Sequence, residues 1–98
     1  MLTIGVIGAG TMGSGIAQVA IAAGETVRLY DPFPQATERG LEMIKKNLTY
    51  LISKKKITAD ESSDMLARLV IVTATSDLAP CDLVIEAIIE DEPLKKEL

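Results

Sequence analysis

Three glycines mark a short stretch near the start of the chain, Gly8-Ala9-Gly10-Thr11-Met12-Gly13. The residues before it, 2–7, form a nearly continuous apolar run, which is typical of a strand buried on both faces of a sheet. In residues 11–23, small and apolar side chains recur at helical spacing, and Gly24 follows where a helix would stop. The stretch is therefore predicted to be the turn between a buried strand and a helix.

The rest of the sequence predicts further strands and helices. β-Branched and aromatic residues in 26–30 indicate a second strand, which leads into Asp31. A helical hairpin is predicted over about residues 34–69, with one helix at 34–53 and another that opens at Thr58, where Glu61 completes a capping box. The elements expected after it are a third strand at 70–73, a loop at 74–80, a fourth strand at 82–87 and the start of a helix at 93–98.

This order of elements predicts an α/β fold. A strand–helix–strand opening is almost always a right-handed crossover in a parallel sheet. We therefore expect a Rossmann-type doubly wound parallel sheet whose first four strands lie in the order 3-2-1-4. Two helices between the second and third strands exceed what one crossover needs, so the hairpin should stand partly off the sheet. Four strands make such a sheet incomplete, and residues 1–98 are expected to be a truncated, partial domain.

The amino-acid composition argues against several classes of function for this chain. The chain has 98 residues, 48% of them hydrophobic and 3% aromatic, which fits one small aliphatic core. A net charge of −4 and few aromatic side chains disfavour nucleic acid as a partner. One cysteine and no histidine leave no metal site to be expected. The start has neither the features of a secretory signal nor those of a membrane span, so a cytoplasmic location is expected.

In a dinucleotide-binding site, each glycine of the stretch would have its own structural role. Gly8 would allow a tight turn, Gly10 would let the backbone approach a pyrophosphate, and Gly13 would permit close packing of helix on strand. The N-terminus of the helix then offers free N–H groups and a partial positive charge to phosphates. The alternative is a turn in which the glycines serve packing alone.

Asp31 completes the pattern, 18 residues after Gly13 (31 − 13) and at the end of the predicted second strand. A carboxylate there accepts the ribose hydroxyls of the adenosine and repels a 2′-phosphate. Pro32, Phe33 and Pro34 follow it, so no arginine is expected to hold such a phosphate, which favours NAD over NADP. The alternatives are an aspartate that only initiates a turn, and the FAD enzymes and methyltransferases that share this pattern.

Three segments together resemble the 3-hydroxyacyl-CoA dehydrogenase family, including the bacterial 3-hydroxybutyryl-CoA dehydrogenases. The glycine stretch continues through Ser-Gly-Ile to Ala17 as it does in that family. The sequence Val-Ile-Glu-Ala-Ile-Ile-Glu at 84–90, followed by Lys95, is similar to the family's fourth strand. The hairpin with Lys-Lys-Lys-Ile at 54–57 resembles the family's helical insert. The resemblance spans essentially the whole chain.

The resemblance implies NAD as the cofactor and acyl-CoA as the substrate. It adds Ala87, Glu90 and Lys95, on the nicotinamide side, to the glycine stretch and Asp31 as cofactor-binding residues. It also places Lys54 against the acyl-CoA. The alternatives are a cation that complements the helix dipole for Lys54, and ordinary surface charges for Glu90 and Lys95. The cofactor-binding residues are then Gly8, Ala9, Gly10, Thr11, Met12, Gly13, Asp31, Ala87, Glu90 and Lys95.

The activity that the resemblance implies is the reversible oxidation of 3-hydroxyacyl-CoA to 3-oxoacyl-CoA. In that family a histidine takes the proton of the 3-hydroxyl and a glutamate orients the histidine. The 98 residues contain no histidine, so no catalytic residue is assigned here and this piece alone is expected to be inactive. The resemblance also implies a helical C-terminal domain, absent here, through which the parent forms a homodimer. The alternatives are another NAD-dependent β-hydroxyacid dehydrogenase or a non-catalytic NAD-binding module.

Overall fold

The structure is a computed structural model, and it describes residues 2–87. In chain order its elements are β1 (Thr3–Ile7), α1 (Thr11–Ala22), β2 (Thr26–Tyr30), α2 (Pro34–Ser53), α3 (Ala59–Ala67), β3 (Leu69–Ile71), the 3-10 helix η1 (Thr75–Leu78) and β4 (Leu83–Glu86). The helix predicted at 93–98 lies outside the described residues, as do Glu90 and Lys95.

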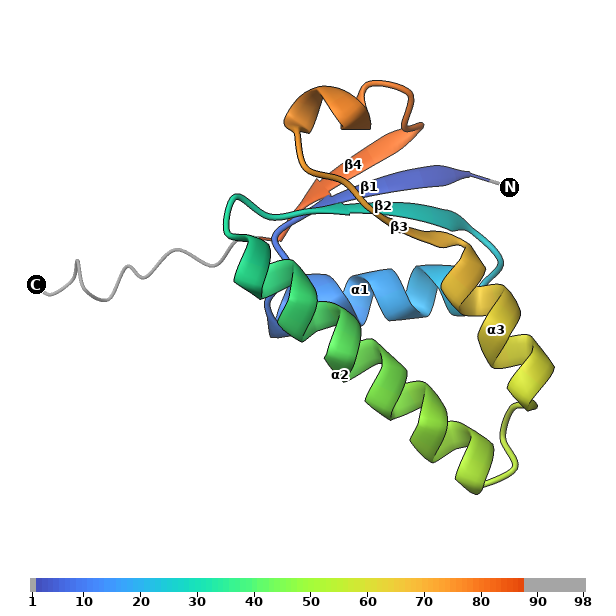
Figure 1. The fold of residues 1–98 in the computed structure, drawn as a ribbon. Helices are drawn as coiled ribbons and strands as arrows, with labels where there is room; N and C mark the ends of the chain where they lie inside the picture. The colour runs from blue at the N-terminus through green and yellow to red at the C-terminus, as the bar shows by residue number, and fades with distance from the viewer. Residues whose placement is uncertain (1, 88–98) are drawn as a thin grey trace, which may run out of the picture.

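The four strands form one parallel sheet in the order β3-β2-β1-β4, which confirms the predicted fold class (Figure 1). β1 lies between β2 and β4, with Val6 paired to Leu29 on one side and to Ile85 on the other. Because all the strands run in the same direction, their carboxyl ends meet at one edge of the sheet. The glycine turn (residues 8–13) follows β1 at that edge, beside the ends of β2 and β4.

The three α-helices cover one face of the sheet (Figure 1). The core between helices and sheet contains fully buried Val6, Val27 and Leu29 from the strands, with Ile21 of α1 and Ile44 of α2. The far end of the α2–α3 hairpin extends away from the sheet, as predicted. Of the helices in residues 2–87, none combines the length and apolar character that crossing a bilayer requires.

The first strand, the first helix and the fourth strand are each one or two residues shorter than predicted (2–7, 11–23 and 82–87). Two further predictions differ from the structure in a way that has a nonlocal cause. The third strand was expected at 70–73 but spans Leu69–Ile71, because it is an edge strand whose extent is set by its pairing with residues 27–29 of β2. The predicted loop at 74–80 contains η1, which places Leu78 over Gly5 of β1 on the face opposite the helices. Leu78 is buried there, and a Cβ on Gly5 would lie 3.2 Å from its side chain.

Helices α1 and α2 end in the same way. The N–H of Gly24 donates to Ile21, and the N–H of Lys55 donates to Ile52. This C-terminal pattern requires a left-handed residue just after the helix, with φ +94° at Gly24 and +59° at Lys55. Glycine adopts that conformation freely, whereas for a lysine it costs about 1–2 kcal/mol. The end of α2 is therefore strained at Lys55.

Candidate dinucleotide site

A cleft of about 360 Å³ opens at the carboxyl edge of the sheet. Its walls come from the glycine turn, the end of β2, the start of α2 and the residue after β4, which are distant in sequence. The residues that line it are Gly8, Gly10, Thr11, Met12, Asp31, Pro32, Phe33, Ala36, Arg39 and Ala87.

The glycines of the turn have three different roles. Gly8 has a φ of +108°, which favours glycine on backbone grounds. A Cβ on Gly13 would lie 1.7 Å from the carbonyl oxygen of Gly8, so Gly13 is required by packing. Gly10 has a φ of −73°, and a Cβ there would meet no atom of residues 2–87 within 4 Å. Neither backbone nor packing explains a glycine at position 10, and the open space above it fits a ligand that approaches the backbone.

The amino end of helix α1 forms the floor of the cleft. No side chain within residues 2–87 caps this end, and the first turn holds no acidic residue. Its N–H groups therefore remain available, and the helix dipole adds a partial positive charge. Thr11 and Met12 of this turn are exposed to the cleft. The arrangement suits an anion such as a diphosphate.

The carboxylate of Asp31 is fixed by the backbone on both sides. One oxygen accepts a hydrogen bond of 2.9 Å from the N–H of Ala9, and the other accepts one of 2.8 Å from the N–H of Phe33. A carboxylate offers about four acceptor positions, so both oxygens can still accept a further donor. Asp31 lines the cleft, where its carboxylate can accept hydroxyl groups.

Helix α2 packs directly onto the back of the glycine turn. The hydroxyl of Ser14, which is almost completely buried, donates to the carbonyl of Ala9 at 2.9 Å. A Cβ on Gly40 would lie 2.6 Å from that hydroxyl oxygen and 2.8 Å from the Ala9 carbonyl. Gly40 therefore sets how closely α2 approaches the cleft. Gly40 was not among the predicted site residues, although a glycine inside a helical run is a sign of close packing.

The structure corrects one expectation about the surroundings of Asp31. The three residues after Asp31 suggested that no arginine would be near, but Arg39 lines the same cleft. Helix α2 begins at Pro34, directly after the turn that follows Asp31, and its second turn lies beside the amino end of α1. The residues adjacent to Asp31 give no sign of Arg39, because Arg39 reaches the cleft from helix α2.

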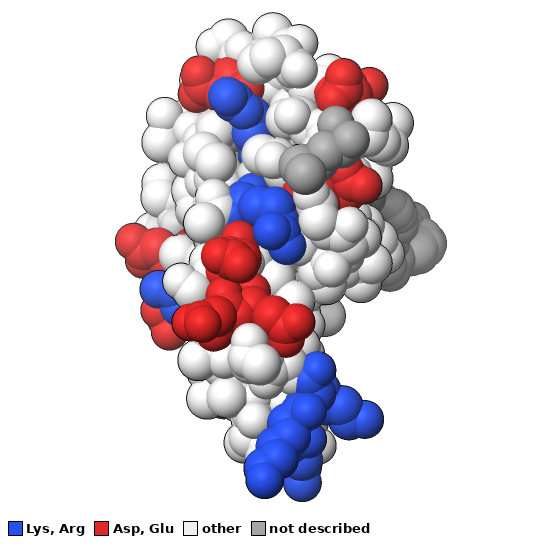
Figure 2. Space-filling model, turned by 90° about the vertical axis from the view of Figure 1, so that its right-hand side faces the viewer, with Lys and Arg blue, Asp and Glu red and all other residues white. Residues whose placement is uncertain are grey.

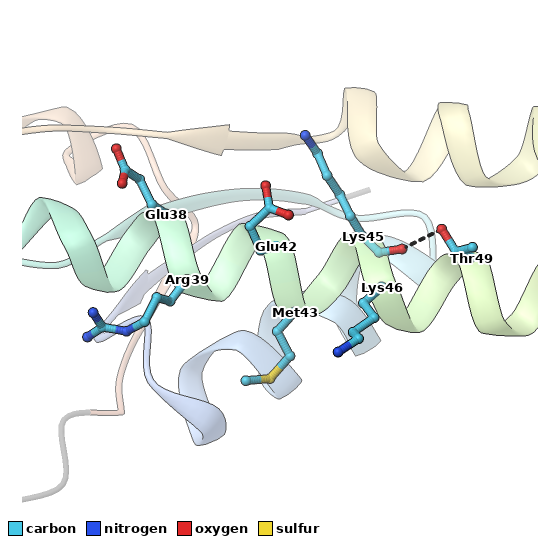
Figure 3. Close-up of a pocket in the computed structure, with 7 residues that line it drawn as sticks. All are labelled: Glu38, Arg39, Glu42, Met43, Lys45, Lys46 and Thr49. Atoms are coloured by element: carbon cyan, nitrogen blue, oxygen red, sulfur yellow. Dashed lines mark hydrogen bonds between the residues drawn. The ribbon is translucent and has the colours of Figure 1, made fainter.

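A larger hollow of about 830 Å³ lies along α2, but all the residues that line it come from a single helix. All seven residues that line it belong to this one helix: Glu38, Arg39, Glu42, Met43, Lys45, Lys46 and Thr49. Figure 3 shows Glu38 and Glu42 on the opposite side of α2 from Arg39 and Met43. These side chains do not surround a common space, so the smaller cleft is the better candidate site.

The structure brings most of the predicted cofactor residues together. Those that line the cleft are Gly8, Gly10, Thr11, Met12, Asp31 and Ala87. Ala9 and Gly13 are buried directly behind it. Glu90 and Lys95 lie outside the described residues.

Lys54 is remote from the cleft. It follows the last residue of α2, and at 1.5 Å per residue it lies about 30 Å along the helix from Pro34. Its ammonium group lies 5.6 Å from the ring centre of Tyr50. Lys54, Lys55 and Lys56 are all exposed and form a basic tip at the end of the hairpin, visible at the bottom of Figure 2. We call these three residues the lysine tip.

Comparisons with known proteins agree with this geometry. Residues 3–98 match the family model of the 3-hydroxyacyl-CoA dehydrogenase NAD binding domain. The 3-hydroxybutyryl-CoA dehydrogenase of Bradyrhizobium diazoefficiens is 43% identical over 95 residues, 97% of this chain and 32% of that protein. The 3-hydroxyadipyl-CoA dehydrogenase of Escherichia coli is 44% identical over 96 residues, 98% of this chain and 20% of that protein.

A solved structure shares the fold. The crystal structure of (S)-3-hydroxybutyryl-CoA dehydrogenase from Ralstonia eutropha superposes with a TM-score of 0.89 at 39% identity, over 97% of this chain and 34% of that one. The chain thus spans about a third of the length of most of the relatives it matches. By its sequence match and its cleft, the chain belongs to the NAD-binding domain family of the 3-hydroxyacyl-CoA dehydrogenases.

Proposed function

We propose that the protein containing this domain is an NAD-dependent dehydrogenase that interconverts 3-hydroxyacyl-CoA and 3-oxoacyl-CoA. The observation that carries the proposal is the open space over Gly10, between the uncapped end of α1 and the fixed carboxylate of Asp31. Family membership supports the acyl-CoA class of substrate, since relatives over this region are 3-hydroxybutyryl-CoA and 3-hydroxyadipyl-CoA dehydrogenases.

In this proposal the dinucleotide lies along the carboxyl edge of the sheet. The glycine turn and the amino end of α1 bind the diphosphate, and Asp31 accepts the hydroxyls of the adenosine ribose. Ala87, Glu90 and Lys95 contact the nicotinamide side. NAD supplies the hydride acceptor when bound, and the chain supplies its position and orientation.

The lysine tip is proposed to bind the phosphate-bearing part of acyl-CoA, with Lys54 as the contact. Three exposed cations within three residues favour a polyanionic ligand, and the stacking of Lys54 near Tyr50 restricts its side chain. The base that takes the hydroxyl proton is not among these 98 residues, which contain no histidine.

Two properties of the whole protein complete the proposal. We expect a homodimer formed outside residues 1–98 and a cytoplasmic location. Light scattering on the full-length protein and fractionation of its host cells test these two expectations independently of the chemistry.

The activity is tested on the full-length protein by following NADH absorbance with acetoacetyl-CoA. We expect turnover, together with saturable NADH binding by fluorescence. Binding of NADH without turnover of any short 3-oxoacyl-CoA would contradict the proposed reaction, and no NADH binding would contradict the cofactor site.

The CoA contact is tested separately. Lys54→Ala should raise the KM for acetoacetyl-CoA by about fivefold or more, because a charge-assisted contact is lost, with little change in the KM for NADH. Lys45→Ala, which removes an exposed lysine from the middle of α2, is the matched control. Equal effects of the two substitutions would remove Lys54 from the proposal.

A further inference from the structure

Two opposite charges line the cleft, Asp31 after β2 and Arg39 on α2. Figure 3 shows the guanidinium of Arg39 extending back toward the amino end of α2, on the opposite side from Glu38 and Glu42. The hydrogen bond from Asn47 to Gln18 of α1, at 2.9 Å, shows that the neighbouring flank of α2 faces α1. Arg39 therefore brings a cation to the cleft from a side on which those two acids do not lie.

The Asp31 carboxylate has little freedom to move away from a ligand. Both its oxygens are held by backbone N–H groups, those of Ala9 and Phe33, at 2.9 and 2.8 Å. A phosphate on the 2′-oxygen of the adenosine ribose would meet this fixed negative charge. Rotation of the side chain would break both hydrogen bonds, so the carboxylate is held where it would repel such a phosphate.

Arg39 has the chemistry that such a phosphate requires. A guanidinium is always charged and presents a planar fork of donors that matches phosphate oxygens. Its side chain is exposed, so it can adjust to a ligand in the cleft. The amino end of α1 already provides donors for the diphosphate, which leaves the arginine for a phosphate elsewhere on the dinucleotide.

We propose that this cleft rejects 2′-phosphorylated dinucleotides through Asp31 alone, and that Arg39 binds the 2′-phosphate once the carboxylate is removed. The inference rests on the proposed binding of NAD in this cleft. It makes Arg39 a latent ligand for a 2′-phosphate, which has no role when the unsubstituted protein binds NAD. A single substitution should then admit NADP without any new basic residue.

The test measures the Kd of NADH and NADPH by fluorescence titration of the full-length protein. Asp31→Ser should tighten NADPH binding by about tenfold or more, because a repulsive charge is lost and an attractive one remains. Adding Arg39→Gln to that variant should weaken NADPH about tenfold more than it weakens NADH. Lys46→Gln in the same background removes a nearby α2 cation that does not line the cleft, and should leave the gain in NADPH affinity intact.

The outcomes separate the inference from the proposed function. Equal weakening of NADH and NADPH by Arg39→Gln would place the arginine on the diphosphate and overturn the inference. NADH binding with no gain for NADPH in Asp31→Ser would also overturn it. If the unsubstituted protein binds neither dinucleotide, the proposed function itself fails. Should Asp31→Ser not fold, Asp31→Asn keeps a hydrogen-bond acceptor for one N–H and gives the same comparison.

Discussion

The backbone N–H of Ala9 donates a 2.9 Å hydrogen bond to the carboxylate of Asp31, and this bond joins the glycine turn to the end of β2. The two residues are 22 positions apart in the chain. The carboxylate that is proposed to bind the ribose therefore also holds the shape of the turn that is proposed to bind the diphosphate. Binding and local stability are coupled through one side chain.

This coupling predicts that Asp31→Ala lowers both stability and affinity. Two backbone N–H groups lose a charged acceptor, which should reduce the free energy of unfolding by about 1–3 kcal/mol. NADH binding should weaken by about tenfold or more. Urea denaturation and fluorescence titration measure the two effects, with Glu42→Ala, an exposed acid of α2, as control. Unchanged stability in Asp31→Ala would show that the turn keeps its shape without the carboxylate.

Substitution of two glycines of the turn is predicted to have different effects, one on NADH binding and the other on stability. Gly10→Ala should change the free energy of unfolding by less than about 1 kcal/mol, since its Cβ meets no atom of the part of the chain that the structure describes. The same substitution should weaken NADH binding about tenfold or more. Gly13→Ala should destabilise the fold by about 3 kcal/mol or more, because its Cβ would collide with the Gly8 carbonyl. Thermal unfolding and NADH titration of both variants test this. A Gly10→Ala protein that binds NADH normally would refute the ligand role of the space above Gly10.

Local signals explain which parts of the fold could be predicted from the sequence. The predicted bounds of β2 and α2 match the structure, because Asp31 and Pro32 end the strand and Pro34 starts the helix. The capping box at Thr58 and Glu61 is confirmed at 3.0 and 2.8 Å. The third strand was misplaced by one residue at its start because pairing with β2, a nonlocal contact, sets its limits.

The same distinction holds in the candidate site. The residues of the glycine turn and Asp31 were predicted because their spacing reflects the chemistry of a dinucleotide. Arg39 could not be predicted as a site residue, because its place in the cleft depends on how closely α2 approaches α1. That approach is set by the contact of Gly40 with Ser14 and Ala9, which has no counterpart in the spacing of the motif.

The close approach of α2 predicts an unusual response to alanine. In a helix interior, replacement of glycine by alanine ordinarily stabilises by about 0.5–1 kcal/mol. Gly15→Ala in α1 should show that gain, because its Cβ meets nothing within 4 Å. Gly40→Ala should instead destabilise by about 1–2 kcal/mol, since its Cβ would press on Ser14 and Ala9. Urea denaturation compares the two, and a gain in stability for Gly40→Ala would mean that α2 can move away from the turn at little cost.

The lysine tip provides the last prediction, because one of its residues is strained. Lys55→Gly relieves a left-handed conformation that costs a lysine about 1–2 kcal/mol, and loses about 0.4–1 kcal/mol through the greater freedom of glycine in the unfolded chain. The net expectation is a gain of about 0.5–1 kcal/mol. Lys56→Gly removes the same charge without relieving strain, so it should be destabilised by about 0.4–1 kcal/mol.

Comparing these two variants separates conformation from charge. A strained lysine where glycine would be more stable is reason to expect that its charge serves binding. Both variants should then raise the KM for acetoacetyl-CoA, by similar factors, although their stabilities change in opposite directions. If Lys55→Gly gains stability and leaves that KM unchanged, the strain at the end of α2 has no role in binding acyl-CoA, and the proposed contact would rest on Lys54 alone.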